Sequence, residues 1–250
     1  MFSEFNNDTL ASMAKNYPEH EAIIKTILSE NKKTTSMFVH ELRNPLSLLK
    51  GTIQYIELKH PEAREFKYWD QIQDLANDME HIMADASLLN AYSYLIKDNT
   101  NLITLISSII SNFMPQALTL QIDFSITIDP NSEEYFTSYS CDSTKLKQAI
   151  SNLIKNALEA TTSGNFIHID LKYLPEESTS LPKLFIQISN NGSPIPADVI
   201  ENIFIPFVTY KKGGTGVGLA LVKKVVDLHY GSICVESRED LTAFTILLPL

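Results

Sequence analysis

The sequence predicts an α+β protein built from two parts. The first is a helical hairpin that pairs with a second copy to form a dimeric four-helix bundle, and the second is an α/β two-layer sandwich. Apolar residues recur at helical spacing between residues 19 and 95, whereas helical runs and alternating, strand-like segments follow one another from residue 100 onward. The length of 250 residues exceeds that of a typical single domain, and 44% hydrophobic with 20% charged residues is ordinary for a folded chain.

The helical part contains two long runs. The first covers about residues 19–58, and His60-Pro61 ends it. The second covers about residues 62–94 and includes Trp69, which we expect to pack in or near the bundle. A lone hairpin cannot bury both of its apolar stripes, so a homodimer is expected. We therefore assign residues 19–95 to a dimerisation domain, which follows a polar N-terminal segment, residues 1–18.

The second part, residues 100–250, mixes the two periodicities. Helices are predicted over residues 102–113, 143–160 and 218–229, with Asp142 or Ser143 placed to cap the second of them. Strands are predicted over residues 121–128, 166–171, 184–189, 232–236 and 243–248. Helices and mainly antiparallel strands within one region indicate a two-layer α+β sandwich.

Composition and charge exclude several classes of protein. The formal net charge of −10 argues against nucleic acid as a partner, because phosphate backbones require basic surfaces. Cys141 and Cys234 lie far apart and fit no metal-binding spacing. No apolar run approaches the ~20 residues of a membrane span, and the N-terminus lacks the pattern of a signal peptide. We expect a soluble cytoplasmic protein with no membrane span of its own.

The segment Phe38–Leu46 carries the first candidate chemistry. On a helix, His40 and Asn44 lie one turn apart on one face, and Glu41 is adjacent to the histidine. A histidine nucleophile needs one ring nitrogen free and the other hydrogen-bonded, and a neighbouring carboxylate can take its proton. Taken alone, a histidine on a charged helix is more often a solvated surface residue.

A pair of asparagines forms the second motif. Asn152 and Asn156 are four residues apart in a predicted helix whose other faces are apolar, so they share one face. Amide oxygens of this kind suit a hydrated Mg²⁺ and its phosphate partners, since Mg²⁺ prefers oxygen ligands and keeps several waters. Lys155, beside them, either reaches a phosphate or points to solvent.

Two further motifs follow later in the chain. Asn190-Asn191-Gly192 comes directly after a predicted strand, and by itself it would be an ordinary turn. Residues 203–222 contain Phe-x-Pro-Phe, two lysines and four of the eight glycines of the chain, followed by a helix. Glycines let the backbone approach phosphates, a helix N-terminus favours anions, and clustered glycines suit a mobile lid.

Together these motifs resemble, in order and spacing, the boxes of the histidine kinases of two-component systems. Residues 38–46 resemble the H-box, 147–160 the N-box, 190–196 the G1 box and 203–222 the F-box and G2 box, and the resemblance covers about residues 20–250. It implies the ATP-binding sandwich that histidine kinases share with gyrase and MutL, known as the Bergerat or GHKL fold. His229-Tyr230-Gly231 also resembles the end of a helix in that fold, where the glycine serves as the helix stop.

The resemblance implies a role for each matching residue. His40 would attack the γ-phosphate of ATP, Glu41 would act as the base, and Asn44 would position water for dephosphorylation of a response regulator. Asn156 would hold Mg²⁺. The implied ATP-binding residues are Asn152, Lys155, Asn156, Asn190, Gly192, Ile195, Phe204, Phe207, Lys211, Lys212, Gly214, Thr215, Gly216, Val217, Gly218 and Leu219. The implied partners are a second copy, the receiver domain of a response regulator and an upstream sensor protein.

Two positions depart from the family pattern. Asn190 stands where an aspartate usually accepts the adenine amino proton, and Pro194 replaces the second glycine of the G1 box. A neutral acceptor makes a weaker hydrogen bond than a charged one. Two alternatives to an autokinase therefore stay open: a phosphotransferase or phosphatase with weak or no ATP binding, and a regulatory scaffold without chemistry.

Overall fold

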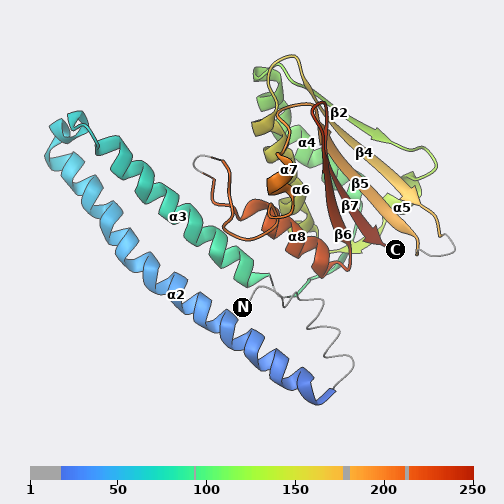
Figure 1. Ribbon diagram of the computed structural model, residues 1–250, viewed down its shortest axis with the longest axis horizontal. Helices are drawn as coiled ribbons and strands as arrows, with labels where there is room; N and C mark the ends of the chain where they lie inside the picture. The colour runs from blue at the N-terminus through green and yellow to red at the C-terminus, as the bar shows by residue number, and fades with distance from the viewer. Residues whose placement is uncertain (1–17, 93, 177–180, 212–213) are drawn as a thin grey trace. The chain divides into compact units, whose positions relative to one another are not determined.

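The computed structural model describes residues 18–92, 94–176, 181–211 and 214–250. The chain divides into two compact units, Met1–Asn90 and Ala91–Leu250 (Figure 1). The first unit is a helical hairpin and the second is an α/β sandwich, so both predicted architectures are confirmed.

The hairpin consists of α2 (Pro18–Lys59), a 3₁₀ turn η1 (Pro61–Glu65) and α3 (Trp69–Ala91). The prediction that the second helix begins near residue 62 is wrong. Pro61 opens the 3₁₀ turn, and Phe66 then takes an extended backbone (φ −71°, ψ 133°), so α3 begins at Trp69. Helix α2 continues through Pro45, which has no backbone N–H and so leaves the carbonyl of Glu41 without its helical partner.

A heptad stripe forms the core of the hairpin. The buried residues of α2 are seven positions apart, and so are those of α3, as in a coiled coil. They are Val39, Leu46 and Ile53 on α2 and Trp69, Ala76 and Met83 on α3, with Ala63 in the turn. The Trp69 indole Nε1 donates a hydrogen bond to Glu57 Oε1 (2.9 Å), which confirms that this tryptophan packs in the hairpin.

The sandwich contains twelve elements among its described residues. They are β1 (Asp98–Thr100), α4 (Leu102–Thr119), β2 (Asp123–Ile128), α5 (Glu133–Thr137), β3 (Tyr139–Cys141), α6 (Ser143–Ala160), β4 (Phe166–Leu174), β5 (Lys183–Asn190), α7 (Ala197–Ile200), α8 (Gly218–Leu228), β6 (Ser232–Ser237) and β7 (Thr242–Pro249). The main sheet has the order β2-β4-β5-β7-β6, in which β2 and β4 are parallel and the other pairs antiparallel. The sequence did not predict β1, β3, α5 and α7, which have only three to five residues each and show no periodicity.

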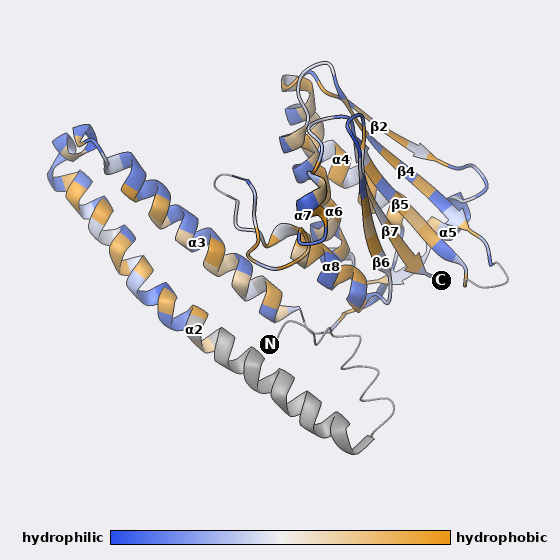
Figure 2. Cartoon of the chain, in the orientation of Figure 1, coloured by the Kyte–Doolittle hydropathy of each residue, from blue (hydrophilic) through white to orange (hydrophobic). Residues whose placement is uncertain are grey.

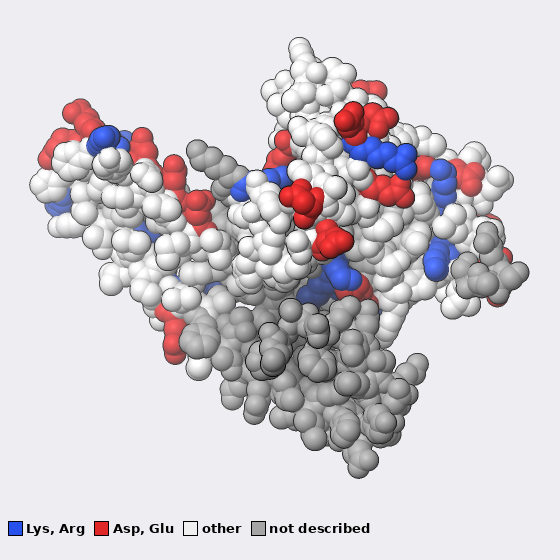
Figure 3. All heavy atoms as spheres, viewed as in Figure 1, with Lys and Arg blue, Asp and Glu red and all other residues white. Residues whose placement is uncertain are grey.

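One face of the sheet is covered by α4, α6 and α8 (Figures 1 and 2). Every second residue of β5 is buried beneath these helices, namely Leu184, Ile186 and Ile188. Helix α4 is the one helix among the described residues that is long and apolar enough to cross a membrane, but five of its residues are buried within the sandwich. On the face shown in Figure 3, acidic and basic side chains are interleaved and form no continuous basic surface.

The end of α8 differs from the prediction in one respect. Tyr230, not Gly231, takes the left-handed backbone (φ 60°) that ends the helix, and the N–H of Gly231 donates to Val226 O (3.0 Å). Gly231 is needed for space, because a Cβ there would lie 2.4 Å from Leu247 O on β7. Close packing of the chain against β7, and not backbone conformation, therefore explains this glycine.

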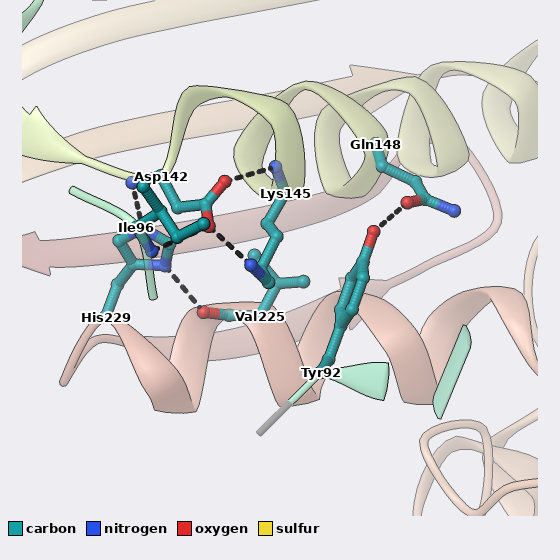
Figure 4. A network of polar contacts seen from close by, with 7 residues as sticks. All are labelled: Tyr92, Ile96, Asp142, Lys145, Gln148, Val225 and His229. Carbon is teal, nitrogen blue, oxygen red and sulfur yellow. Dashed lines mark hydrogen bonds and ion pairs between the residues drawn. The ribbon is translucent and has the colours of Figure 1, made fainter. Parts of the chain in front are cut away.

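A buried polar junction holds the start of α6 against the end of α8 (Figure 4). The His229 ring, 1% exposed, accepts a hydrogen bond from the N–H of Asp142 at Nε2 (3.0 Å), while its Nδ1 contacts Val225 O (2.8 Å). Asp142 caps α6 through the N–H of Lys145 and also accepts from the N–H of Ile96 (3.1 Å). One histidine and one aspartate thus join α6, α8 and the segment that enters the sandwich.

The same junction explains two pKa shifts. Burial lowers the pKa of His229, because the apolar surroundings disfavour the imidazolium. For Asp142, burial alone would raise the pKa, but hydrogen bonds from Lys145 and from the N–H of Ile96 outweigh it and the pKa of this carboxyl is lowered. The native junction therefore contains a neutral histidine beside an ionised aspartate.

We predict that His229→Ala lowers the free energy of unfolding of the chain by about 2–4 kcal/mol. It leaves the N–H of Asp142 without its acceptor, removes the ring contact with the carbonyl of Val225 and opens a cavity. The wild type should also lose stability as the pH falls below the ordinary histidine value of 6.5, because the unfolded chain then binds a proton that the folded chain excludes. Urea denaturation at pH 7.5 and 5.5 measures both effects.

His168→Ala is the control for this experiment. His168 contacts Ser125 Oγ (3.0 Å) at the sheet surface and joins no helices. The proposed role of the junction is wrong if His229→Ala and His168→Ala destabilise the protein equally, or if the pH dependence between 7.5 and 5.5 survives in His229→Ala.

Candidate active site

The residues expected to carry the phosphoryl group lie on the hairpin. His40, Glu41 and Asn44 are all exposed on α2, and His40 and Asn44 are one turn apart. Val39, next to His40, is buried in the hairpin core and fixes the rotation of the helix at this point. The helix thus presents an imidazole, a carboxylate and an amide to solvent on a rigid element.

The other predicted site residues belong to the sandwich, and α6 supplies the first of them. Leu146, Ile150 and Leu153 bury one face of this helix, so Asn152 and Asn156 are only partly buried at its border. Asn152 Nδ2 donates to the carbonyl of Gly218 at the start of α8 (3.3 Å). The amide of Asn152 therefore joins the asparagine helix to the helix that follows the glycine-rich segment.

A lysine ammonium group already lies against the predicted Mg²⁺ ligand. Lys211 Nζ is 3.2 Å from Asn156 Oδ1 and 2.7 Å from Glu159 Oε2. An amide oxygen and a carboxylate oxygen that converge on a cation are the donor types that Mg²⁺ prefers, so these residues fit that ion. Glu159 was missed as a site residue, although its position one turn from Asn156 was a usable signal.

Lys155 borders this cluster through Glu159. Its side chain is 68% exposed, and its ammonium lies 3.9 Å from Glu159 Oε1. Within the described residues, no group of three or more His, Cys, Asp and Glu side chains could hold a metal ion.

Asn190 ends β5 at the inner face of the sheet. It continues the inward series of β5, it is 3% exposed, and its Nδ2 has no hydrogen-bond partner. A buried amide donor without a partner costs about 1–3 kcal/mol, a cost that a ligand acceptor can offset. Gly192, two residues later, packs so closely on the end of α6 that a Cβ would lie 2.1 Å from Ala160 O.

Two hydroxyl residues that the sequence reasoning missed lie beside Asn190. Thr242 on β7 is its cross-strand partner and is 4% exposed. Thr242 Oγ1 lies 2.7 Å from Ser237 Oγ, and Ser237 Oγ accepts from the N–H of Ile195 (2.8 Å). Alternation along β7 already placed Thr242 on the inward face, but only the strand register pairs it with Asn190.

The glycine-rich segment is anchored at both ends. Phe204 is half-buried and packs edge-to-face on Phe244, with 6.5 Å between ring centroids. The N–H of Phe207 donates to the carbonyl of Gly216 (3.0 Å), and both residues have left-handed backbones, with φ 65° and 70°. A phenylalanine rarely adopts this conformation, so the base of the loop is strained and held by its surroundings.

The remaining predicted residues follow along this segment. Val217 is buried and is the N-cap residue of α8, and its side chain makes no capping hydrogen bond. Uncapped N–H groups at a helix start are suited to bind an anion such as phosphate. Gly214 is exposed, Thr215, Gly218 and Leu219 are partly buried, and Lys212 lies outside the described residues.

Comparison with known proteins identifies the sandwich. Residues 141–250 match the family of histidine kinase-, DNA gyrase B- and HSP90-like ATPases. The chain is 30% identical over 213 residues to the sensor histidine kinase ZraS of Salmonella typhimurium, covering 84% of this chain and 44% of that protein. It is 31% identical over 260 residues to the sensory histidine kinase/phosphatase NtrB of Azospirillum brasilense, covering 98% of this chain and 61% of that protein. The chain thus spans about half the length of these relatives.

Solved structures give the same result. The catalytic domain of histidine kinase ThkA is 33% identical and matches with a TM-score of 0.53 over 61% of this chain and 95% of that domain. ThkA in complex with the response regulator protein TrrA is 29% identical and matches with a TM-score of 0.61 over 92% of this chain and 65% of that one. Because the identity to the ThkA catalytic domain extends over nearly all of that domain, the chain belongs to the histidine kinases.

Proposed function

We propose that this chain is an ATP-dependent protein histidine autokinase of a two-component system. In this proposal His40 accepts the γ-phosphoryl group of ATP and passes it to an aspartate of a response regulator. The observation that carries the proposal is the convergence of Asn156 and Glu159 on a cation beside the uncapped start of α8. Such a site suits a nucleotide triphosphate and its counterion, and the position of His40 in the segment that resembles the H-box supports it as the acceptor.

In this proposal the hairpin supplies the nucleophile and the base, and the sandwich binds the phosphate groups. An exposed ring nitrogen of His40 attacks the γ-phosphorus in line with the leaving oxygen, and Glu41 takes the proton that the ring loses. The N–H groups at the start of α8 and the ammonium of Lys211 stabilise the negative charge on the phosphate oxygens. Asn44 is placed to orient water toward a phosphorylated regulator, which would add a phosphatase activity.

Asn156 and Glu159 would hold Mg²⁺ when the nucleotide binds. The ion would supply charge neutralisation between phosphate groups, as it does in phosphoryl-transfer enzymes generally. Lys211, which occupies the same oxygens in the free protein, must then move toward the phosphates. The position of this lysine therefore supports a lid that closes only on the loaded nucleotide.

An exposed second heptad stripe supports a homodimer. Leu42 and Leu49 on α2, and Ile72 and Met79 on α3, each follow a buried core residue by three positions. These four side chains are 41–55% exposed in the hairpin. Apolar residues at alternating spacings of three and four form a complete coiled-coil seam. One hairpin buries only half of these residues, and a second hairpin would bury the four that remain exposed.

The phosphoryl acceptor is tested directly. The 250-residue chain incubated with γ-labelled ATP and Mg²⁺ should acquire acid-labile, base-stable label, and His40→Gln should reduce it at least about a hundredfold, since no other side chain replaces the nucleophile. His81→Gln, which removes another exposed histidine of the hairpin, is the matched control and should keep the label.

The other outcomes of that assay select the alternatives. If the wild type takes no label from ATP but accepts it from a phosphorylated regulator, the chain is a phosphotransferase. If it takes label from neither source, the chain acts as a scaffold, and the autokinase proposal is wrong.

The cation site has its own prediction. Asn156→Ala should weaken ATP binding in the presence of Mg²⁺ at least about tenfold, because it removes one of two converging oxygens, and it should have little effect in EDTA. Lys147→Ala, which alters an exposed lysine on the same helix that has no assigned role in the site, should bind ATP as the wild type does. Isothermal titration calorimetry with and without Mg²⁺ measures both, and an equal loss in EDTA would contradict the assigned role.

The dimer is tested by charging the open stripe. Leu49→Lys combined with Met79→Lys should weaken dimerisation at least about a hundredfold, because each protomer then brings two unpaired charges to an apolar seam. Leu48→Lys is the matched control, since Leu48 is 73% exposed and lies off the stripe. Sedimentation equilibrium should show a monomer only for the double variant, and a monomeric wild type would refute the dimer.

A further inference from the structure

Asn190 differs chemically from the aspartate that its position usually holds in this family, and the difference bears on which base the site accepts. A carboxylate offers only acceptors, whereas an amide offers one acceptor and one donor side by side. In the structure the donor side, Nδ2, is buried and has no partner, while the residue itself is 3% exposed. A buried donor of this kind calls for an acceptor on the ligand. The inference rests on the proposed function, because it concerns the nucleotide that the sandwich binds.

The purine bases present two different edges to such a residue. Adenine carries a donor at its 6-amino group and an acceptor at N1, whereas a 6-oxopurine carries an acceptor at O6 and a donor at N1. A carboxylate pairs with the 6-amino group but repels O6, because two acceptors would then face each other in a buried site. An amide pairs with either edge when it turns by half a rotation about its last bond.

The hydroxyl groups of Thr242 and Ser237 can likewise either donate or accept a hydrogen bond. Thr242 lies opposite Asn190 in the strand register, and both residues are directed inward from the sheet. Ser237 Oγ already accepts the N–H of Ile195, so one hydroxyl hydrogen bridges Ser237 and Thr242 in either direction. When Ser237 donates, Thr242 has a hydrogen to offer a ligand, and when Thr242 donates, it has a lone pair to offer.

We propose that Asn190 and Thr242 form a base-recognition edge that accepts 6-amino and 6-oxo purine nucleotides with similar affinity. The edge carries no fixed charge and can present donor and acceptor in either order. An aspartate at position 190 would fix one side as an acceptor and so exclude the 6-oxo group. Asn190 is therefore the residue that sets base selectivity in this chain.

The test compares ADP with IDP, which differ only in the purine edge and do not support turnover. Both are titrated with Mg²⁺ into the 250-residue wild type, Asn190→Asp and Asn191→Asp. We expect wild-type dissociation constants for ADP and IDP within about tenfold of each other, and a ratio raised at least about a hundredfold in favour of ADP in Asn190→Asp. ADP binding itself should be unchanged or tighter in Asn190→Asp, since a charged acceptor makes the stronger bond.

Asn191→Asp is the matched control. It adds the same charge one residue away, on a side chain already engaged with the N–H of Phe166 (2.7 Å) and with Asn165 Oδ1 (3.2 Å), and it should keep the wild-type ratio. The proposal is overturned if the wild type prefers ADP by more than about a hundredfold, or if Asn190→Asp leaves the ratio unchanged.

The ratio of the IDP and ADP dissociation constants in the wild type tests the proposal even if Asn190→Asp fails to fold. ADP binding with strong selectivity would refute the base-recognition edge and leave the autokinase proposal intact. A wild type that binds neither nucleotide at millimolar concentration would refute both.

Discussion

The geometry of the nucleotide site depends on the buried junction between Asp142 and His229. The junction holds the start of α6 to the end of α8 through a neutral imidazole that accepts one backbone N–H and contacts one backbone carbonyl. Both helices carry site residues, and Asn152 joins them again by its hydrogen bond to Gly218 O. One polar contact therefore lies at each end of α8, at His229 and at Gly218. Together they fix the register of α8 against α6, because apolar contacts are less directional than hydrogen bonds. The asparagine face of α6 is thereby held at the uncapped start of α8.

Charge within the site is balanced before any nucleotide binds. Lys211 lies between Asn156 and Glu159, so the oxygens suited to a cation already have one. The loop that carries this lysine closes at Phe207 and Gly216, where a non-glycine residue is held in a left-handed backbone. Lys211 thus ties this loop to α6, while a residue at the base of the loop is held in a strained backbone.

Local pattern predicted much of the fold. The long helices and the sheet strands of the sandwich follow from periodicity, and the cap of α6 is Asp142, one of the two residues expected there. The short elements were missed, since β1 and β3 become strands only by pairing with each other across the chain. The start of α3 was placed too early because the helical run was begun directly after His60-Pro61, whereas a 3₁₀ turn and an extended residue, Phe66, come before Trp69.

The sequence by itself determined the family, the two architectures and the order of the boxes, because those depend on residue types at fixed spacing along the chain. Tertiary structure decided which side chains meet. Glu159 met the ammonium of Lys211 and also lies near that of Lys155. Thr242 became the neighbour of Asn190 through the register of β5 and β7. Periodicity assigns a residue to a face of one element, whereas contacts between elements depend on register and packing, which no single segment encodes.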